Sequence, residues 1–68
     1  MGKLEYIRRN LGLTKKEAAK RLDLQYVYYC LFEKCKKRGS FDVWERVQEE
    51  FNIPDEEMWK IVREHLNK

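Results

Sequence analysis

The sequence predicts a single all-α domain of five helices. Three observations predict it: apolar residues recur at helical spacing, helix-capping residues separate the segments, and the 68 residues include only one Pro and three Gly. A chain of this length has room for one small core, which is only marginally stable alone. Close helix packing or dimerisation is therefore expected to contribute to its stability.

The composition favours a cytoplasmic protein. No apolar run approaches the roughly 20 residues that a membrane span needs, and no signal-peptide pattern precedes the first helix. Cys30 and Cys35 have the spacing of neither a C-x-x-C motif nor a metal knuckle. Two reduced thiols in a cytoplasmic protein are the simplest interpretation.

The first expected helix spans residues 3–10. Leu4, Ile7 and Leu11 recur on one side of it and predict its apolar stripe. Gly12 suits the left-handed conformation that often ends a helix.

Residues 14–36 are expected to contain two short helices joined by a tight turn. Thr14 and Glu17 have the spacing of a capping box, so a helix should begin here and run from Lys15 to Leu22. Two alanines on its inward side allow a second helix to come close. Asp23 and Leu24 predict the turn.

Gln25 is expected to open the next helix, which should end at about Glu33 or Lys36. A helix, a three-residue turn and a second helix make up a helix-turn-helix unit. This unit is mostly used to lay its second helix in the major groove of DNA.

The same stretch resembles the phage repressor and Cro family of helix-turn-helix domains, the Xre-like group. The residues that match the family pattern in the unit itself are Leu13, Thr14, Glu17, Ala19, Leu22, Leu24, Tyr29 and Glu33. Further matches lie upstream, at Ile7, Arg8 and Leu11-Gly12-Leu13, and downstream, at Phe51-Asn52-Ile53-Pro54 and Met58. The resemblance covers about residues 3–60 and implies a five-helix, lambda-repressor-like domain. It also implies a DNA-binding transcriptional regulator of a prokaryote or phage.

Two contacts follow from this resemblance. Arg8 is expected to form a salt bridge with Glu33, which would tie the first helix to the third; the alternative is two solvated charges. Lys15 is expected to contact a backbone phosphate near its helix N-terminus, as a point charge. An ordinary solvated lysine is the alternative there.

The third helix has unusual chemistry for a DNA reader. Tyr29 and Phe32 match buried positions of the family, which leaves an apolar outer side made of Tyr26, Val27, Tyr28, Cys30 and Leu31. Val and Leu can touch only a thymine methyl, and Tyr offers one hydroxyl. Either this face still contacts DNA, or it marks an interface with a partner protein, since exposed apolar surface tends to indicate a partner. A third alternative is that the burial assignment is rotated by one residue.

Charge is distributed unevenly along the chain. Residues 1–40 contain eleven Lys/Arg against four Asp/Glu, a net +7, and residues 41–68 contain four against eight, a net −4. A basic half that carries the helix-turn-helix unit is what a DNA-facing surface requires. The alternative is charge segregation without a function.

Four cations follow the third helix directly. The helix dipole accounts for one or two cations at a helix C-terminus more readily than for four, and contact with phosphates accounts for all. The DNA-contact residues expected from the sequence are Lys15, Gln25, Tyr26, Val27, Tyr28, Leu31, Lys34, Lys36, Lys37 and Arg38.

Two further helices complete the domain. Ser40 is expected to cap the fourth, whose apolar residues Val43, Trp44, Val47 and Phe51 form a core stripe, and Asn52 closes it. Pro54 leads the fifth helix. Its apolar residues cover more than one side: Met58, Trp59, Ile61, Val62, His65 and Leu66. The fifth helix is therefore the candidate contact of a homodimer; the alternative is that it simply wraps the core.

Enzyme chemistry finds little support. His65 is the only histidine, and neither a G-x-S-x-G motif nor a phosphate-binding glycine loop is present. Cys35 and His65 together would supply too few ligands for structural zinc. We expect no catalytic site, no cofactor and no bound metal. The expected partners are double-stranded DNA and a second copy of the chain, with a partner protein as the alternative.

Overall fold

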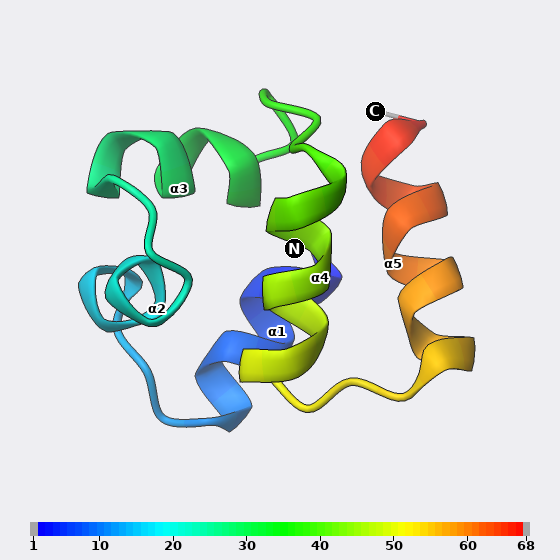
Figure 1. Cartoon of the computed structure of the whole chain (residues 1–68), viewed down its shortest axis with the longest axis horizontal. Coiled ribbons are helices and arrows are strands. Elements are labelled where there is room, and N and C mark those ends of the chain that lie inside the picture. Colours follow the sequence, from blue (N-terminus) through cyan, green and yellow to red (C-terminus); the bar gives the residue numbers. More distant parts are fainter. Residues whose placement is uncertain (1, 68) are drawn as a thin grey trace.

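Five α-helices account for most of residues 2–67, which are the residues that the computed structural model describes, and no strand occurs among them. The helices are α1 (Lys3–Asn10), α2 (Lys15–Arg21), α3 (Tyr26–Glu33), α4 (Phe41–Glu50) and α5 (Asp55–Leu66). The all-α class with five helices is as predicted. In Figure 1, α4 stands between the α2–α3 pair on one side and α5 on the other.

The predicted helix boundaries need small corrections. α2 ends at Arg21, and Leu22 is its C-cap residue. α3 begins at Tyr26 with Gln25 as N-cap, and it ends at Glu33 rather than continuing to Lys36. Each correction shortens the helix because the chain turns one residue or more earlier than the apolar pattern suggests.

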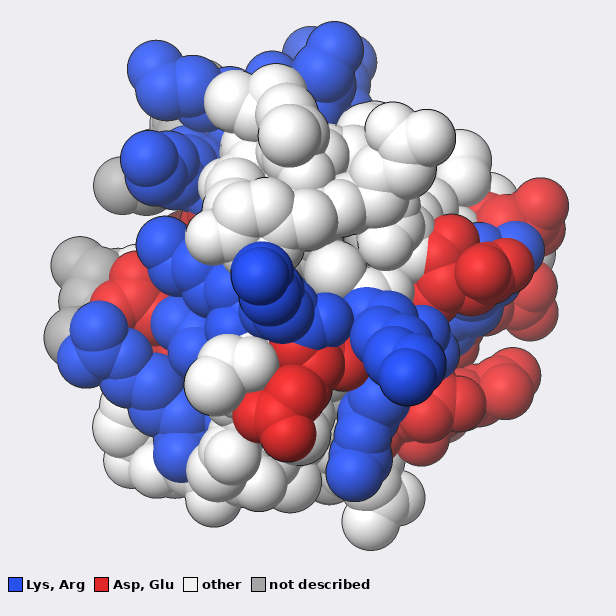
Figure 2. Space-filling model, turned by 90° about the vertical axis from the view of Figure 1, so that its left-hand side faces the viewer, with Lys and Arg blue, Asp and Glu red and all other residues white. Residues whose placement is uncertain are grey.

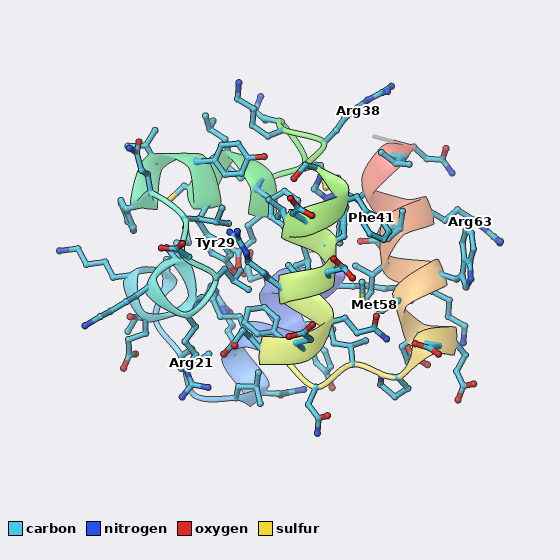
Figure 3. All side chains as sticks on the ribbon, viewed as in Figure 1. Arg21, Tyr29, Arg38, Phe41, Met58 and Arg63 are labelled. Atoms are coloured by element: carbon cyan, nitrogen blue, oxygen red, sulfur yellow. The ribbon has the colours of Figure 1, made fainter. Side chains whose placement is uncertain are left out.

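One apolar core lies between the helices. Its buried members are Leu4, Leu13, Ala18, Ala19, Leu22, Tyr29, Phe32, Val43, Val47, Phe51, Ile53, Met58 and Ile61. Tyr29 lies near the middle of the molecule (Figure 3). Leu11, expected in the stripe of α1, is 46% exposed because it follows the helix as its C-cap residue. Trp44 is only half-buried at the edge of the core.

The helix N-termini follow the sequence signals. Thr14 and Glu17 form both halves of a capping box: the Glu17 amide donates to Thr14 Oγ1 (3.1 Å), and the Thr14 amide donates to Glu17 Oε1 (2.8 Å). The hydrogen bond from the Thr14 backbone, followed by that with its side chain, lowers the pKa of Glu17. Ser40 Oγ accepts from the Val43 amide (3.3 Å) and so caps α4 without a capping box.

Four helices end in the same way, with one residue in the left-handed region and two backbone bonds back into the last turn, which is the Schellman motif. The left-handed residues are Gly12, Asp23, Cys35 and Asn52. After α1, α2 and α4 the next residue is apolar and packs inward: Leu13, Leu24 and Ile53. After α3 the next residue is Lys36, which is exposed. The chain therefore leaves α3 toward solvent.

A buried ion pair joins α1 to α3, as the family resemblance predicts. Arg8 Nε donates to Glu33 Oε1 at 2.7 Å, and both side chains are almost fully buried. Arg8 Nη1 also donates to the Leu13 carbonyl (2.8 Å), and the Tyr29 hydroxyl donates to Glu33 Oε1 (2.9 Å). The hydrogen bond with Glu33 raises the pKa of Arg8, although burial of the guanidinium acts to lower that pKa. For Tyr29, burial of the hydroxyl raises the pKa, and the charge of Glu33 raises it further.

Among the described residues, no helix is both long and apolar enough to cross a bilayer.

Candidate functional site

α2 and α3 pack closely and present one joint surface. Ala18 and Ala19 of α2 and its C-cap residue Leu22 are buried, and the small alanines let the backbone of α3 approach. The cations of α2 lie outside this contact: Lys16, Lys20 and Arg21 are exposed. Lys15, expected on the outer face, is half-buried.

The exposed part of α3 is its first turn. Gln25 is exposed, and Tyr26 and Val27 are 46% and 67% exposed. A hydrogen bond with Cys30 raises the pKa of Tyr26. The first turn thus offers an amide, a hydroxyl and a branched apolar group.

Three side chains expected on the outer side of α3 are half-buried instead: Tyr28, Cys30 and Leu31. Tyr28 lies four residues before the buried Phe32, on the same side of the helix, and their rings are nearly parallel with centroids 6.3 Å apart. This contact brings Tyr28 against the core. The exposed apolar face of α3 is therefore smaller than predicted and consists mainly of Tyr26 and Val27.

The four cations after α3 are exposed, as expected: Lys34, Lys36, Lys37 and Arg38. We call residues 34–38 the basic loop. Two side chains from other helices fix its backbone. Trp44 Nε1 of α4 donates to the Arg38 carbonyl (3.0 Å), and His65 Nε2 of α5 lies 2.6 Å from the Lys37 carbonyl.

His65 has a structural role in this arrangement. A carbonyl oxygen only accepts, so Nε2 must carry the hydrogen in the bond to Lys37. The buried His65 ring also packs against Phe32 and Trp44, with centroids 4.8 and 5.0 Å away. No sequence signal predicts these two anchors, because both bonds go to backbone carbonyls and one carbonyl lies 28 positions away in the chain.

Figure 2 views the side of the molecule on which α2 lies and α3 begins. Lys and Arg side chains gather above and below an area of uncharged surface. The cations come from α2 and from the basic loop, and the uncharged exposed residues of α3 are Gln25, Tyr26 and Val27. Two of the nearby acids have partners: Glu33 pairs with Arg8, and Glu17 caps α2. Asp23, in the turn between α2 and α3, is exposed. Basic side chains thus lie around much of the uncharged area on this side, and acidic side chains lie along one edge and below it (Figure 2).

Cys35 and His65, expected to supply too few ligands for structural zinc, lie close together. Cys35 and His65 line the same small hollow beside the start of α1, but His65 donates to the basic loop. Within residues 2–67, no group of three or more His, Cys, Asp or Glu side chains is placed to hold a metal ion.

The fifth helix exposes part of its apolar surface. Met58, Ile61 and His65 are buried, whereas Trp59 is 71% exposed and Leu66 is also exposed. α5 thus covers the core with one side and leaves an unpartnered apolar stripe on another.

The chain was compared with models of protein families, with curated proteins and with solved structures, and no match was found. Its function is therefore inferred from the chemistry of its own surfaces.

Proposed function

We propose that the chain is a sequence-specific DNA-binding transcriptional regulator, a helix-turn-helix domain of phage repressor and Cro type with a lambda-repressor-like arrangement. The observation that carries this proposal is the exposed first turn of α3 between two sets of cations, one on α2 and one on the basic loop. An α-helix fits the major groove of B-DNA, and cations on both sides of it meet the two phosphate backbones.

The proposed contacts divide into two classes. Lys16, Lys20 and the basic loop would bind phosphates, which gives affinity without sequence information. Gln25, Tyr26 and Val27 would reach base edges: a Gln amide suits adenine, and a Val side chain suits a thymine methyl. The half-buried Lys15, which is next to the N-terminus of α2, remains a candidate phosphate contact.

The tethered basic loop supports this proposal. Flexible cationic tails lose conformational entropy when they bind, whereas a loop already fixed by Trp44 and His65 loses less. Two copies on one duplex would place two α3 helices on half-sites about one helical turn apart. A homodimer on a palindromic site is therefore part of the proposal.

A rival function uses the same turn of α3. Val27 is 67% exposed beside Tyr26, and apolar surface of this kind also suits a partner protein. Under this rival, the domain is a protein-interaction module and the cations are only a solvated surface.

Two sets of substitutions separate the functions. Under the proposal, replacing Lys36, Lys37 and Arg38 with Gln should weaken binding to every DNA sequence. Under the rival, neither the wild type nor this variant should bind DNA. Replacing Tyr26 and Val27 with Ala should change the preferred sequence selected from a random library while binding to random DNA persists. The rival would be favoured if the wild type binds no DNA but captures a partner protein in a pull-down, and if the Tyr26→Ala/Val27→Ala variant no longer captures that partner.

A further inference from the structure

An apolar groove lies between α4 and α5, and Trp44 in its lining also donates to the Arg38 carbonyl of the basic loop. Its volume is about 530 Å³, within the range of small-molecule sites. The apolar residues that line it are Phe41, Trp44, Met58, Trp59 and Val62. Figure 3 shows Phe41 and Met58 between the two helices.

The groove is not simply the edge of the core. Phe41 and Trp59 are 76% and 71% exposed, so two large rings project into solvent where they flank the opening. Burying rings of this size is a large part of the energy of many interfaces. An occupant with apolar side chains would cover both.

The rim of the groove is acidic. Glu45 and Asp55 line it, and the exposed carboxylates Asp42, Glu49 and Glu56 lie on the same two helices. Gln48 donates to the Asp55 carboxylate and to the Ile53 carbonyl, which fixes this wall. The cations of α4 and α5 have other contacts or point elsewhere. Arg46 donates to the Leu22 carbonyl, Lys60 pairs with Glu57, and Arg63 points away from α4 (Figure 3).

We propose that this groove binds a cationic amphipathic helix of another protein. Apolar side chains of the helix would enter between Phe41 and Trp59, and its Lys or Arg side chains would pair with Glu45 and Asp55. A helix lying along the groove would be a third helix beside α4 and α5, which is the helix-in-groove mode of recognition. The exposed rings would also attract cations through their faces.

A second copy of this chain fits the groove less well. In a symmetric dimer the same patch meets itself, so Glu45 and Asp55 of one copy would face the acidic rim of the other. Like charges across an interface cost energy. The two copies on a palindromic DNA site are therefore brought together by the duplex and not by this groove.

The test uses the whole chain and three synthetic peptides of about four helical turns, without Trp or Tyr. The first has apolar residues at helical spacing flanked by Lys and Arg; the second has the same apolar residues with Glu in place of every cation; the third is a scramble of the first. Binding is followed by the fluorescence of Trp44 and Trp59 and, for variants that lack Trp59, by calorimetry. We expect saturable binding of the cationic peptide and at least about tenfold weaker binding of the other two.

Variants of the chain complete the test. Trp59→Ala should weaken binding of the cationic peptide at least about tenfold, because an exposed ring that becomes buried in a complex is a typical hot spot. Glu45→Gln should weaken binding of this peptide by a smaller factor and should make the binding less dependent on salt. Tyr6→Ala, which removes an exposed ring of α1 outside the groove lining, is the matched control and should have no effect.

Several results would overturn the proposal. Equal binding of the acidic peptide, or an unchanged affinity in Trp59→Ala, would show that the groove does not select a cationic partner. A dimer in sedimentation that Trp59→Ala dissociates would assign the groove to a second copy. Because Trp59 lies outside the basic surface, its variant should bind DNA as the wild type does, so this proposal and the DNA proposal fail independently.

Discussion

At the scale of single residues, Arg8 and Glu33 explain how the third helix is fixed. The carboxylate accepts from Arg8 and from the Tyr29 hydroxyl, so it is bonded to α1 and to the preceding turn of α3 at once. Two charges taken from water gain little net stability when paired. We expect the pair to contribute mainly to the orientation of α3, because the hydrogen bonds among Arg8, Tyr29 and Glu33 form together only when α3 is correctly placed.

Glu33→Gln tests this network. The amide keeps the size and one acceptor oxygen but removes the charge, which leaves a buried guanidinium without compensation. We expect a loss of about 3–5 kcal/mol in the free energy of unfolding, measured by urea denaturation.

The matched control is Glu5→Gln. Glu5 pairs with Arg9 on the surface of α1 at 3.0 Å, and this change should cost about 1 kcal/mol or less. Equal losses in the two variants would contradict the buried network.

Glu17 gives an acid-dependent contribution. The capping box lowers its pKa below the ordinary value of 4.5, so the folded state favours the charged form. The resulting stability is present above the unfolded pKa and is lost as the pH falls through the folded pKa.

Glu17→Gln keeps an acceptor for the Thr14 amide but cannot titrate. The urea midpoint of the wild type should therefore exceed that of the variant near neutral pH, and the gap should narrow as the pH falls below about 4. A gap that stays constant through this range would show that the charge of Glu17 does not contribute.

At the scale of elements, the end of α3 differs from the ends of the other helices. Cys35 has a left-handed φ of 65°, where Gly or Asn is usual, and no apolar residue follows it. The chain then returns to α4 through Gly39, whose φ is 80°. A hypothetical Cβ at Gly39 would lie 2.5 Å from Phe32 Cε1 and 3.3 Å from Trp44 Nε1. The absence of a side chain at Gly39 lets the basic loop lie against Phe32 and Trp44.

Gly39→Ala should therefore destabilise the fold more than Gly12→Ala. Both glycines have a positive φ, which costs an alanine about 1–2 kcal/mol. No atom lies near a Cβ at Gly12, whereas Gly39→Ala also displaces the buried Phe32 ring, for about 1–3 kcal/mol more. Thermal or urea unfolding of the two variants measures the difference, and equal effects would contradict the close approach.

Elements set by local signals were predictable from the sequence. The capping box of Thr14 and Glu17, the left-handed Gly12 and Asn52, and the five-helix order all depend on neighbours within a few residues. The ion pair of Arg8 and Glu33 spans 25 positions and was expected only from the family resemblance.

Features that depend on tertiary packing were not predictable. Whether Tyr28 faces solvent or packs beside Phe32 on the core depends on a small rotation of α3 about its own axis. The apolar pattern does not define this rotation, because nearly every residue of α3 is apolar. The anchoring of the basic loop by Trp44 and His65 required the positions of α4 and α5. The left-handed Cys35 has no local signal of the usual kind.

At the scale of the whole molecule, the two proposed sites divide along the same line as the charge. The basic half forms α1 to α3 and the basic loop, and the acidic half forms α4 and α5. Under the two proposals, the basic half would steer the chain to nucleic acid, and the acidic half would meet a cationic partner. The two proposed sites thus have opposite charge and lie on different elements.

The most direct test of the DNA proposal is the affinity for duplex DNA of random sequence across a salt series. The wild type is compared with Lys36→Gln/Lys37→Gln on the basic loop and with Lys60→Gln/Arg63→Gln on α5, which removes the same charge from exposed sites on the other half. The account predicts steep salt dependence for the wild type and a slope smaller by about two in the loop variant. It predicts an unchanged slope in the α5 variant. No binding at low salt, or equal slopes in the two variants, would contradict it.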